Sequence, residues 1–415
     1  MDLSYPPDVE AFRLEIRAWI ASQLPEDWTE RRRDPHAAGE IAEGWNAMLH
    51  ETGWSCPMWP LEYGGRGLSV VQAVVWSEEL ARVEAPIQPP AGGELLLGPT
   101  LLHFGTGAQK DRFLPPIVHG REVWCQGFSE PDAGSDLASL QTTAVREGDR
   151  YIINGHKIWT SQAQEADWIF MLARTNPDAP RHRGISYLLV PMHQPGIEVR
   201  PLVQPDGTAG FNEVHFSDAA TDADNLVGGV DNGWGVAMST LGFERGTSAT
   251  SSWQRYERDW RAMVEEARRS GTASEPVMRQ RLARAWSQIQ IMRINGYRIV
   301  TAVLHPEVED QTRALEAGTK TYWTEFHQEL TNLGLDLLGP HGQVLTGGSA
   351  APGVGLGDRP VVHPYPAGEL QSAFLFARSG TIFGGTAQVQ RNIIGERVLG
   401  LPREPPAAGS RPGAG

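Results

Sequence analysis

The sequence predicts an α+β protein in which two helical parts flank a smaller β-rich part. Apolar residues recur at helical spacing up to about residue 121 and again after Trp234. Between these parts lie short runs rich in β-branched and aromatic residues, separated by turn residues. We therefore expect an N-terminal α-helical domain (1–121), a middle antiparallel, barrel-like β-domain (122–232), a C-terminal helical bundle (233–400) and a disordered tail (401–415).

The composition is that of a soluble globular protein, with 40% hydrophobic and 21% charged residues. A length of 415 residues is typical of two or three domains. The net charge of −14 argues against a nucleic-acid-binding surface, which would need a basic face. No apolar run is long enough to span a bilayer, and the N-terminus lacks the apolar core of a signal peptide. We expect a cytoplasmic protein.

The only two cysteines, Cys56 and Cys125, are too few for a disulfide framework. Neither has another cysteine or a histidine nearby at the spacing of metal ligands, so we predict no metal site. Both are expected to be buried thiols.

Four segments of the N-terminal part show helical spacing. The first begins at Val9 and is closed by Pro25, and the glycine-rich segment Trp59–Gly67 is expected to connect two helices. The expected helices are Val9–Ile20, Ile41–Glu51, Ser69–Val83 and Gly98–Phe113, the last ending near Pro115-Pro116.

The strongest β signal is Asn154-Gly155, a dipeptide typical of two-residue hairpin turns. It lies within Tyr151–Trp159, which we therefore interpret as two short strands joined by a turn. Further strands are expected at Trp168–Ala173, Ile185–Val190 and Glu213–Phe216.

The C-terminal part is expected to be helical throughout. Leu282, Trp286 and Ile289 recur at positions that share one helix face, and another long helix is predicted over Leu315–Leu338. A glycine- and proline-rich loop (346–368) precedes two shorter helices, expected at Leu370–Arg378 and Thr386–Leu399.

The segment Gly127–Ser139 combines glycines, hydroxyls and carboxylates at unusual density. Pro131 fixes one backbone angle, and Gly134 permits conformations that other residues resist. Such a loop presents backbone N–H and hydroxyl donors that suit an anionic or carbonyl-rich ligand. The same composition is also that of an ordinary polar surface loop, so these residues alone leave both interpretations open.

Several segments together resemble the acyl-CoA dehydrogenase family. Gly127–Ser139 resembles the family's first signature position for position, and the order of helical, β and helical parts matches the family's fold. The resemblance runs from about residue 5 to 402, and its other matching segments are Trp124–Pro131, Tyr151–Gly155, Phe243–Gly246 and Gly384–Ile394. It implies an FAD-dependent enzyme that removes the α-proton of an acyl-CoA thioester and passes the β-hydrogen to flavin N5 as hydride, giving a trans-2-enoyl-CoA.

The resemblance assigns eight residues to FAD. The Phe128 backbone and the Ser129 hydroxyl would meet the pyrimidine edge of the flavin, and Trp159 would stack beside the ring. Considered without the family, Trp159 would be a core aromatic at the end of a hairpin strand, which is the usual position of a Trp. The full set is Gln126, Phe128, Ser129, Ser135 (for the pyrophosphate), Trp159, Ser161 (near flavin N5), and Thr386 and Gln388 (for the ADP portion).

The catalytic base depends on which subgroup the chain resembles. Many family members place a Glu directly before the Gly-Thr of the last signature, but Gly384 occupies that position here. A second subgroup, resembling isovaleryl- and long-chain-type enzymes, places a Glu directly before an Arg, as in Glu244-Arg245. We expect Glu244 to be the base, and Arg245, Gly384 and Gly385 to contact the substrate, with a backbone N–H for the thioester oxygen. The alternative is that Glu244 is a solvated helix residue paired with an Arg.

One family feature is missing. Homotetrameric relatives carry an Arg-x-x-Phe-Gly segment that reaches the FAD of the neighbouring subunit, but residues 268–276 lack it. Asp336 and Pro340 replace the usual Gln and Gly of the adenine-contacting turn. This pattern resembles bacterial dehydrogenases that act on steroid or other bulky acyl-CoA thioesters, several of which assemble from two different chains. Two assemblies stay open: a heterotetramer with a related chain, and a homo-oligomer that holds FAD through other arginines, such as Arg279 or Arg281.

The resemblance also implies an electron-transfer flavoprotein or a similar acceptor as a partner. Two further functions stay open. One is a fold relative with other flavin chemistry, such as nitroalkane oxidation or hydroxylation, which Glu244 disfavours because such an enzyme would carry an Asp at the base position or lack a base. The other is a catalytically silent subunit that completes the FAD site of another chain.

Overall fold

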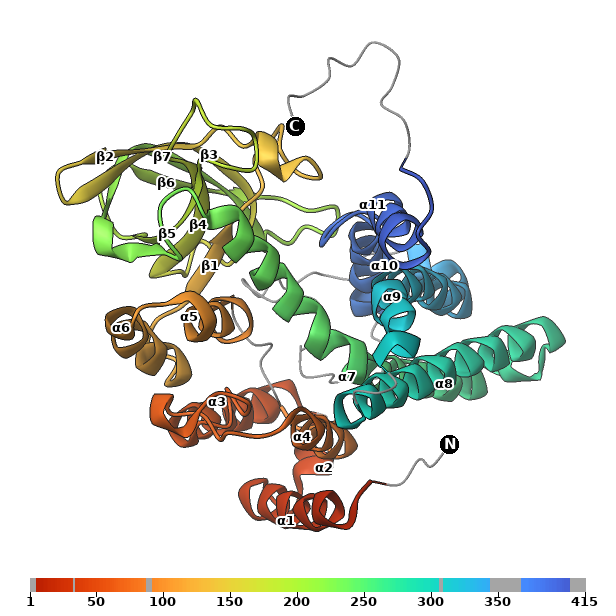
Figure 1. Cartoon of the computed structure of the whole chain (residues 1–415). Coiled ribbons are helices and arrows are strands. Elements are labelled where there is room, and N and C mark those ends of the chain that lie inside the picture. The colour runs from red at the N-terminus through yellow and green to blue at the C-terminus, as the bar shows by residue number, and fades with distance from the viewer. Residues whose placement is uncertain (1–4, 33, 87–91, 306–308, 344–366, 404–415) are drawn as a thin grey trace.

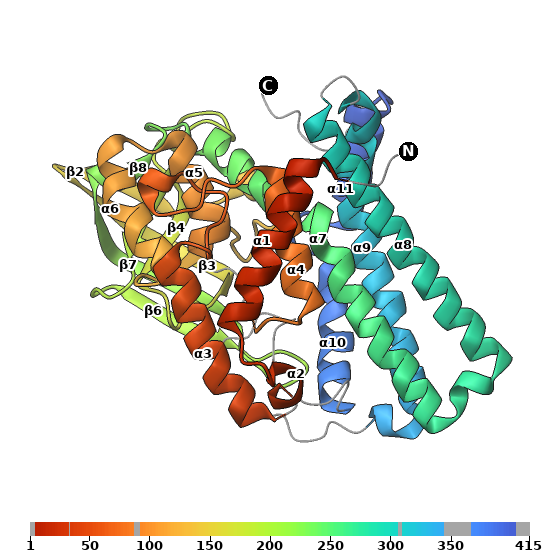
Figure 2. The same ribbon diagram turned by 90° about the horizontal axis from the view of Figure 1, so that it is seen from below.

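Two groups of helices and one sheet make up the structure, a computed structural model (Figure 1). It describes residues 5–32, 34–86, 92–305, 309–343 and 367–403, without the side chains of 35, 244–252, 309–311, 313, 341 and 367–369. The sheet and the N-terminal helices lie on one side of the molecule and the C-terminal helices on the other (Figures 1 and 2). The predicted α+β class and the order of helices, strands and helices are confirmed.

The N-terminal helices pack around a cluster of tryptophans. Trp54 and Trp76 stack with their ring centroids 4.3 Å apart, and Trp19 packs against both. These rings come from the helices Pro7–Gln23 and Val70–Arg82 and from the segment that follows the helix Pro35–Thr52. The helices of this part are α1 (Pro7–Gln23), α2 (Trp28–Arg31), α3 (Pro35–Thr52), α4 (Val70–Arg82), α5 (Gly98–Phe104) and α6 (Gly107–Val118).

The single helix expected over Gly98–Phe113 is in fact two helices, α5 and α6. Thr106 interrupts it and caps α6, because its side chain accepts a hydrogen bond from the Gln109 N–H and the Gln109 side chain bonds back. The expected end at Pro115-Pro116 is also wrong, since α6 continues to Val118. Both prolines lie in the last turn of α6, so they remove backbone donors only near the end of the helix.

The strands form one sheet in the order β6-β7-β3-β2-β4-β5-β8, with β1 parallel to β4. Both faces of β4 and β5 are buried: one packs against α5, α6 and the start of α7, the other against β3 and β7. Because both faces are buried, the sequences of β4 and β5 are continuous apolar runs. The strands are β1 (Trp124–Gly127), β2 (Thr143–Glu147), β3 (Arg150–Ser161), β4 (Trp168–Arg174), β5 (Ile185–Pro191), β6 (Ile197–Leu202), β7 (Phe211–Asp222) and β8 (Leu226–Val227).

The hairpin predicted at Asn154-Gly155 is wrong, because β3 runs through both residues without a turn. Gly155 lies at a bulge of β3, where an added Cβ would be 2.3 Å from the Thr142 Oγ1. The hairpin turn is Gly148-Asp149, between β2 and β3. Gly148 has a φ of +64°, a conformation that this tight turn needs. Strands β2 and β6 were not predicted, because their half-exposed residues give only a weak apolar pattern.

The C-terminal helices form a bundle, and α7 connects it to the sheet. α7 begins against the sheet and runs across the molecule into the bundle (Figure 1). The predicted face of α8 is confirmed: Leu282 and Ile289 are buried, and Trp286 packs 4.6 Å from Trp260 between ring centroids. The helices are α7 (Gly233–Ser270), α8 (Pro276–Leu304), α9 (Glu309–Leu338), α10 (Ala367–Gly380) and α11 (Ala387–Ile393).

Four further expectations concern a loop, the C-terminal tail, membrane spans and the two cysteines. The predicted loop at 346–368 and the tail from 401 lie almost wholly outside the described residues. Among the helices that the structure does describe, none combines the length and the apolar character that crossing a membrane requires. Cys56 and Cys125 are free and buried, as expected. Burial raises the pKa of both thiols, which keeps them protonated and unreactive.

Candidate active site

The carboxylate of Glu130 fixes the loop Gly127–Ser139 through hydrogen bonds and an ion pair. Its two oxygens accept hydrogen bonds from the backbone N–H groups of Gln141 (2.6 Å) and Thr142 (3.0 Å). The Lys157 Nζ of β3 completes the set at 2.8 Å from Oε1. The loop is therefore fixed both to the residues that lead into β2 and to β3.

Lys157 is fully buried, and its ammonium group has two partners on the loop. Besides Glu130, it donates to the backbone carbonyl of Phe128 at 3.2 Å. Burial lowers the pKa of Lys157 to about 8, although the Glu130 carboxylate opposes this change. Burial would raise the pKa of Glu130, but Lys157 keeps it below its usual value. The lowered pKa of Glu130 favours its carboxylate, and a pKa of about 8 still leaves Lys157 mostly protonated at neutral pH, so the pair is charged there.

The predicted FAD contacts Phe128, Ser129 and Ser135 lie on this loop with different exposures. The Phe128 ring is buried among aromatic rings, and its backbone carbonyl accepts the hydrogen bond from Lys157. Ser129 is half-buried, and its carbonyl accepts a hydrogen bond from the Ile158 N–H of β3 at 3.0 Å. Ser135 is exposed. The structure thus brings Ser129 next to β3 and leaves Ser135 open to a ligand.

Gln126 is the best evidence that the site fits a bound group. Its side-chain Nε2 is buried and has no hydrogen-bond partner in the described part of the chain. An unpartnered buried donor costs free energy unless a ligand acceptor satisfies it. The neighbouring Gly127 has no room for a side chain, because an added Cβ would lie 2.7 Å from the Ile169 side chain. These residues fit the flavin cofactor that the family resemblance implies.

Trp159 is not a core aromatic, since its side chain is 59% exposed. It lies in an irregular part of β3, between Lys157 and Thr160, and its φ is +61°. Bulges of this kind redirect side chains, and left-handed backbone is uncommon for an aromatic residue and concentrates at functional sites. The ring contacts Phe211 edge to face at 6.0 Å. The predicted Ser161 follows two residues later and is exposed.

A row of aromatic rings continues from Trp159 into the helical bundle. Phe211 of β7 lies parallel to Phe376 of α10 with centroids 6.5 Å apart, and Phe376 contacts Phe383 at 5.9 Å. The row joins the sheet to the C-terminal helices on the side of Trp159. Sequence reasoning missed Phe211, Phe376 and Phe383, because nothing in the local patterns of β7 or α10 links residues so far apart.

The glycine turn before α11 is tightly organised. Gly384 and Gly385 have φ values of +60° and +88°, which residues with a Cβ adopt at a cost. The Gly384 carbonyl accepts from Gln390 Nε2 (3.1 Å), and the Gly385 carbonyl accepts from Lys320 Nζ (2.7 Å). With both carbonyls bound, the turn is rigid.

Two predicted ADP contacts lie at the start of α11. The Thr386 side chain is occupied as the helix cap, since it accepts a hydrogen bond from the Val389 N–H at 3.1 Å. Gln388 is exposed.

Glu244 and Arg245 lie in α7, and their side chains are outside the described part of the structure. The apolar run before them, residues 234–243, is buried only in part. Val236 and Ala237 are fully buried, whereas Met238 is 40% exposed.

Asp336, which replaces the usual Gln of the adenine-contacting turn, is paired with a cation. Arg281 Nη2 of α8 lies 2.6 Å from the Asp336 carboxylate of α9. Arg281 was one of two arginines considered as a replacement for the missing Arg-x-x-Phe-Gly segment, and within this chain it binds Asp336 instead.

Comparisons with known proteins agree along the whole chain. Three family models match successive parts: the acyl-CoA dehydrogenase N-terminal domain at residues 6–121, the middle domain at 125–219 and the C-terminal domain at 231–399. The acyl-CoA dehydrogenase IpdE1 of Mycobacterium tuberculosis is 45% identical over 402 residues, covering 96% of this chain and 99% of that protein. IpdE1 of Mycolicibacterium smegmatis is 43% identical over 412 residues, with coverages of 96% and 99%.

Two solved structures resemble the chain along nearly its full length. The Tcur3481-Tcur3483 steroid ACAD has a TM-score of 0.79 and 32% identity, covering 97% of this chain and 100% of that chain. The ChsE4-ChsE5 complex from Mycobacterium tuberculosis has a TM-score of 0.76 and 31% identity, with the same coverages.

Proposed function

The chain belongs to the acyl-CoA dehydrogenase family, and on this basis we propose that it dehydrogenates the CoA thioester of a bulky, ring-bearing acyl group with Glu244 as the base. Members of the family are FAD-dependent oxidoreductases that act on acyl-CoA. The observation that carries the proposal is the internally fixed loop Gly127–Ser139 beside the exposed, strained Trp159. Together they form a prearranged surface for a flat, polar-edged cofactor.

The choice of a bulky substrate rests on the relatives and on the apolar surface near the glycine turn. The solved relative with a TM-score of 0.79 is described as a steroid ACAD. In this chain Ile382 and Phe383, directly before the glycine turn, are 65% and 38% exposed. Large exposed apolar side chains beside a site favour a ligand with much apolar surface.

The assignment of the base rests on position. Gly384 leaves no carboxylate at the site that many family members use, whereas Glu244 lies in α7 four residues after Thr240. Thr240 is fully buried, and its hydroxyl lies 2.8 Å from that of Thr100 in α5. α7 therefore packs inside the protein at the turn before Glu244. A buried carboxylate is more basic than an exposed one, and removal of a weakly acidic α-proton requires such a base.

The glycine turn is proposed to stabilise the negative charge that develops on the thioester oxygen. Its carbonyls are bound by Gln390 and Lys320, so its N–H groups do not need to reorganise when the charge develops. FAD, when bound, accepts the β-hydrogen as hydride. Gln126, Ser129 and Ser135 are proposed to hold the cofactor, and Trp159 to cover its ring.

Anaerobic reduction of bound FAD by a panel of acyl-CoA thioesters tests the function. The chain, co-expressed with related chains from its own source, is mixed with CoA thioesters of a steroid-ring acid, a branched short acid and straight-chain acids of several lengths. The expected result is that the ring-bearing thioester bleaches the flavin absorbance fastest. Fastest bleaching by a straight-chain thioester would contradict the substrate class, and no bleaching by any of them would contradict the dehydrogenase assignment.

We further propose that a second, related chain completes the FAD site. The chain lacks the reaching arm of homotetrameric relatives, and its Arg281 is held by Asp336. The relatives Tcur3481-Tcur3483 and ChsE4-ChsE5 are each described by two chain names. The chain purified alone should hold less than one FAD per subunit, and co-purification with the partner should raise this ratio. One tightly held FAD per subunit in a homo-oligomer would contradict the need for a partner.

A further inference from the structure

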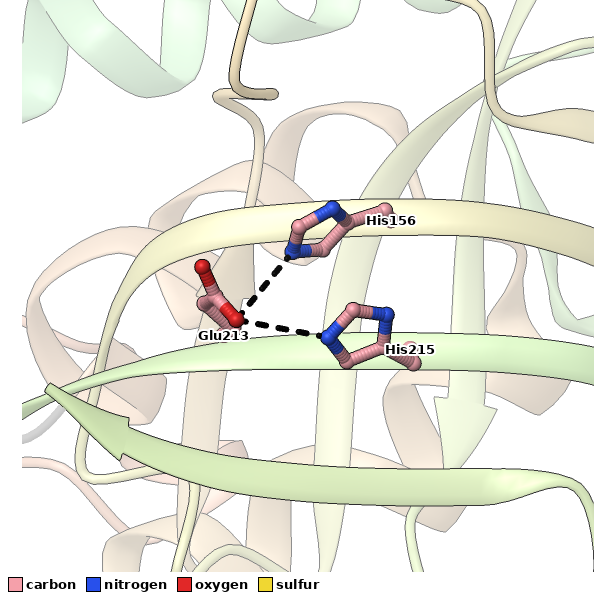
Figure 3. A group of neighbouring side chains, drawn as sticks. All are labelled: His156, Glu213 and His215. Atoms are coloured by element: carbon pink, nitrogen blue, oxygen red, sulfur yellow. Dashed lines mark hydrogen bonds and ion pairs between the residues drawn. The ribbon is translucent and has the colours of Figure 1, made fainter.

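Three side chains outside the flavin loop converge on one point of the sheet surface. His156 of β3 and His215 of β7 are register partners in neighbouring antiparallel strands, and Glu213 lies two residues before His215 on the same face. Figure 3 shows both imidazole rings turned toward the carboxylate of Glu213. The rings stack with centroids 3.9 Å apart and an interplanar angle of 19°.

The distances from the Glu213 carboxylate to the two imidazoles are close to those between ligand atoms around a tetrahedral metal ion. His215 Nε2 lies 3.4 Å and His156 Nε2 lies 3.8 Å from the same oxygen, Glu213 Oε2. Ligand atoms about 2.0–2.1 Å from a tetrahedral ion are about 3.3–3.4 Å from one another. One potential ligand atom from each residue lies within 4.8 Å of the other two. The two glutamate–histidine separations need to shorten by at most a few tenths of an ångström, and the stacked imidazoles have to turn so that their ligand atoms meet at one ion.

Simple ion pairing is a poorer explanation of this arrangement. Two protonated imidazoles stacked 3.9 Å apart would repel each other, and only His215 is within hydrogen-bond distance of the carboxylate. The His156 Nε2 atom is buried without a hydrogen-bond partner in the described structure. On the neighbouring strand β6, Arg200 donates two hydrogen bonds to Glu198, each 2.8 Å long, so this cation is engaged elsewhere.

We propose that His156, Glu213 and His215 bind a divalent transition-metal ion, with Zn²⁺ as the best match to two imidazoles and one carboxylate. Each side chain is between 26% and 30% exposed, so an ion reaches the site from solvent and water fills the remaining coordination positions. Local spacing in the sequence does not indicate the site, because its ligands come from two strands that are far apart in the chain.

The site lies directly beside the flavin loop's anchor. His156 precedes Lys157, whose ammonium group binds Glu130 and the Phe128 carbonyl from the opposite face of β3. The irregular segment with Trp159 follows on the same strand. A bound ion therefore ties β3 to β7 where β3 carries both the loop anchor and the exposed tryptophan, and it stabilises the fold at that point.

Zn²⁺ titration of the tag-free, chelator-treated, FAD-loaded protein tests the proposal, with calorimetry and the thermal midpoint as readouts. The expected result is one saturable site per chain and a midpoint that rises with Zn²⁺. Loss of a residue that only orients a metal ligand weakens metal binding by about 10–100-fold, so His215→Ala and Glu213→Gln, which remove ligands, should weaken it by about 100-fold or more. His193→Ala is the matched control, because His193 has a carboxylate neighbour, Asp167, at 3.4 Å and belongs to no such cluster of described residues.

FAD content and the metal-free thermal midpoint show whether each variant is folded. If His215→Ala fails to fold, Glu213→Gln, which keeps the shape of the side chain, decides the question. Absence of saturable Zn²⁺ binding to the wild-type chain would overturn the proposal. Equal Zn²⁺ affinity in the wild-type chain and in a folded ligand variant would overturn it as well.

Discussion

Lys157 Nζ lies 2.8 Å from Glu130 Oε1 in an ion pair that is almost fully shielded from water. The pair connects the centre of β3 to the loop Gly127–Ser139, and through the same ammonium group to the Phe128 carbonyl. Water does not solvate either charge, so each of the two groups depends on the other for compensation.

Replacing Lys157 with Met is predicted to destabilise the middle domain and to release the cofactor. The change leaves the buried Glu130 carboxylate with its two backbone donors but without a counter-charge. Breaking a buried ion pair costs about 3–5 kcal/mol. The thermal midpoint and the FAD content should both fall. The double variant Lys157→Met with Glu130→Gln should recover part of the loss, and a double variant as unstable as the sum of the two singles would contradict this coupling.

Replacing Glu244 with Gln is predicted to abolish turnover while FAD stays bound. The substitution keeps size and hydrogen bonding but removes the proton acceptor. General bases contribute about 10²–10⁴-fold, and a sole base acting on a weakly acidic C–H bond should be at or beyond the upper end. The measurement is the rate of anaerobic flavin bleaching by the best acyl-CoA. Bleaching at a near wild-type rate would place the base elsewhere.

Replacing Gly384 with Ala is predicted to lower stability, whereas Gly318→Ala is predicted to raise it. Gly384 has a φ of +60°, where a residue with a Cβ is strained by about 1–2 kcal/mol. Gly318 lies in α9 with no atom within 4 Å of an added Cβ, and alanine is favoured there by about 0.5–1 kcal/mol. Urea unfolding of both variants measures the difference. The same sign of change in both would contradict the role of the left-handed turn.

Lowering the pH below about 6.5 is predicted to reduce the free energy of unfolding because of His327 in α9. Burial, and then the charges of Arg255 and Arg378, lower the pKa of His327 to about 3. The unfolded chain takes up a proton below pH 6.5 while the folded chain does not, so folding stability decreases between pH 6.5 and 3 by up to about 1.4 kcal/mol per pH unit.

His327→Gln removes this proton linkage and should give a flatter pH profile of the thermal midpoint, measured between pH 5 and 7.5. The matched control is His36→Gln, since the His36 side chain is 85% exposed. Its profile should run parallel to that of the wild type. A His327→Gln profile as steep as the wild type would exclude His327 as the cause.

The sequence predicted those elements whose local residue preferences agree with their packing in the fold. The face of α8 with Leu282 and Ile289 follows from spacing alone, because one stripe of the helix is buried. The turn at Asn154-Gly155 was predicted wrongly, because long pairings of β3 with β2 and β7 override a local turn preference. Gly148-Asp149 carries the same kind of signal and is the real turn.

The candidate site was predictable where its residues are contiguous. Ser129 and Ser135 lie in one segment, so a motif identifies them, and their structural setting is consistent with a ligand-facing loop. Lys157 and Phe376 were missed, since their importance arises only when β3 meets the loop and α10 meets β7. Such contacts depend on the tertiary fold and leave no trace in local composition.

Strand β6 is one edge of the sheet. Its residues determine whether that edge can pair with a strand of another chain in a crowded solution. Open edges offer unpaired backbone groups to other chains and so seed aggregation. Here Glu198 and Arg200 hold each other along the strand, and Pro201 removes a backbone donor from it. The edge is thus a poor template for a further strand, and a newly synthesised chain is protected there from aggregating with other copies of itself.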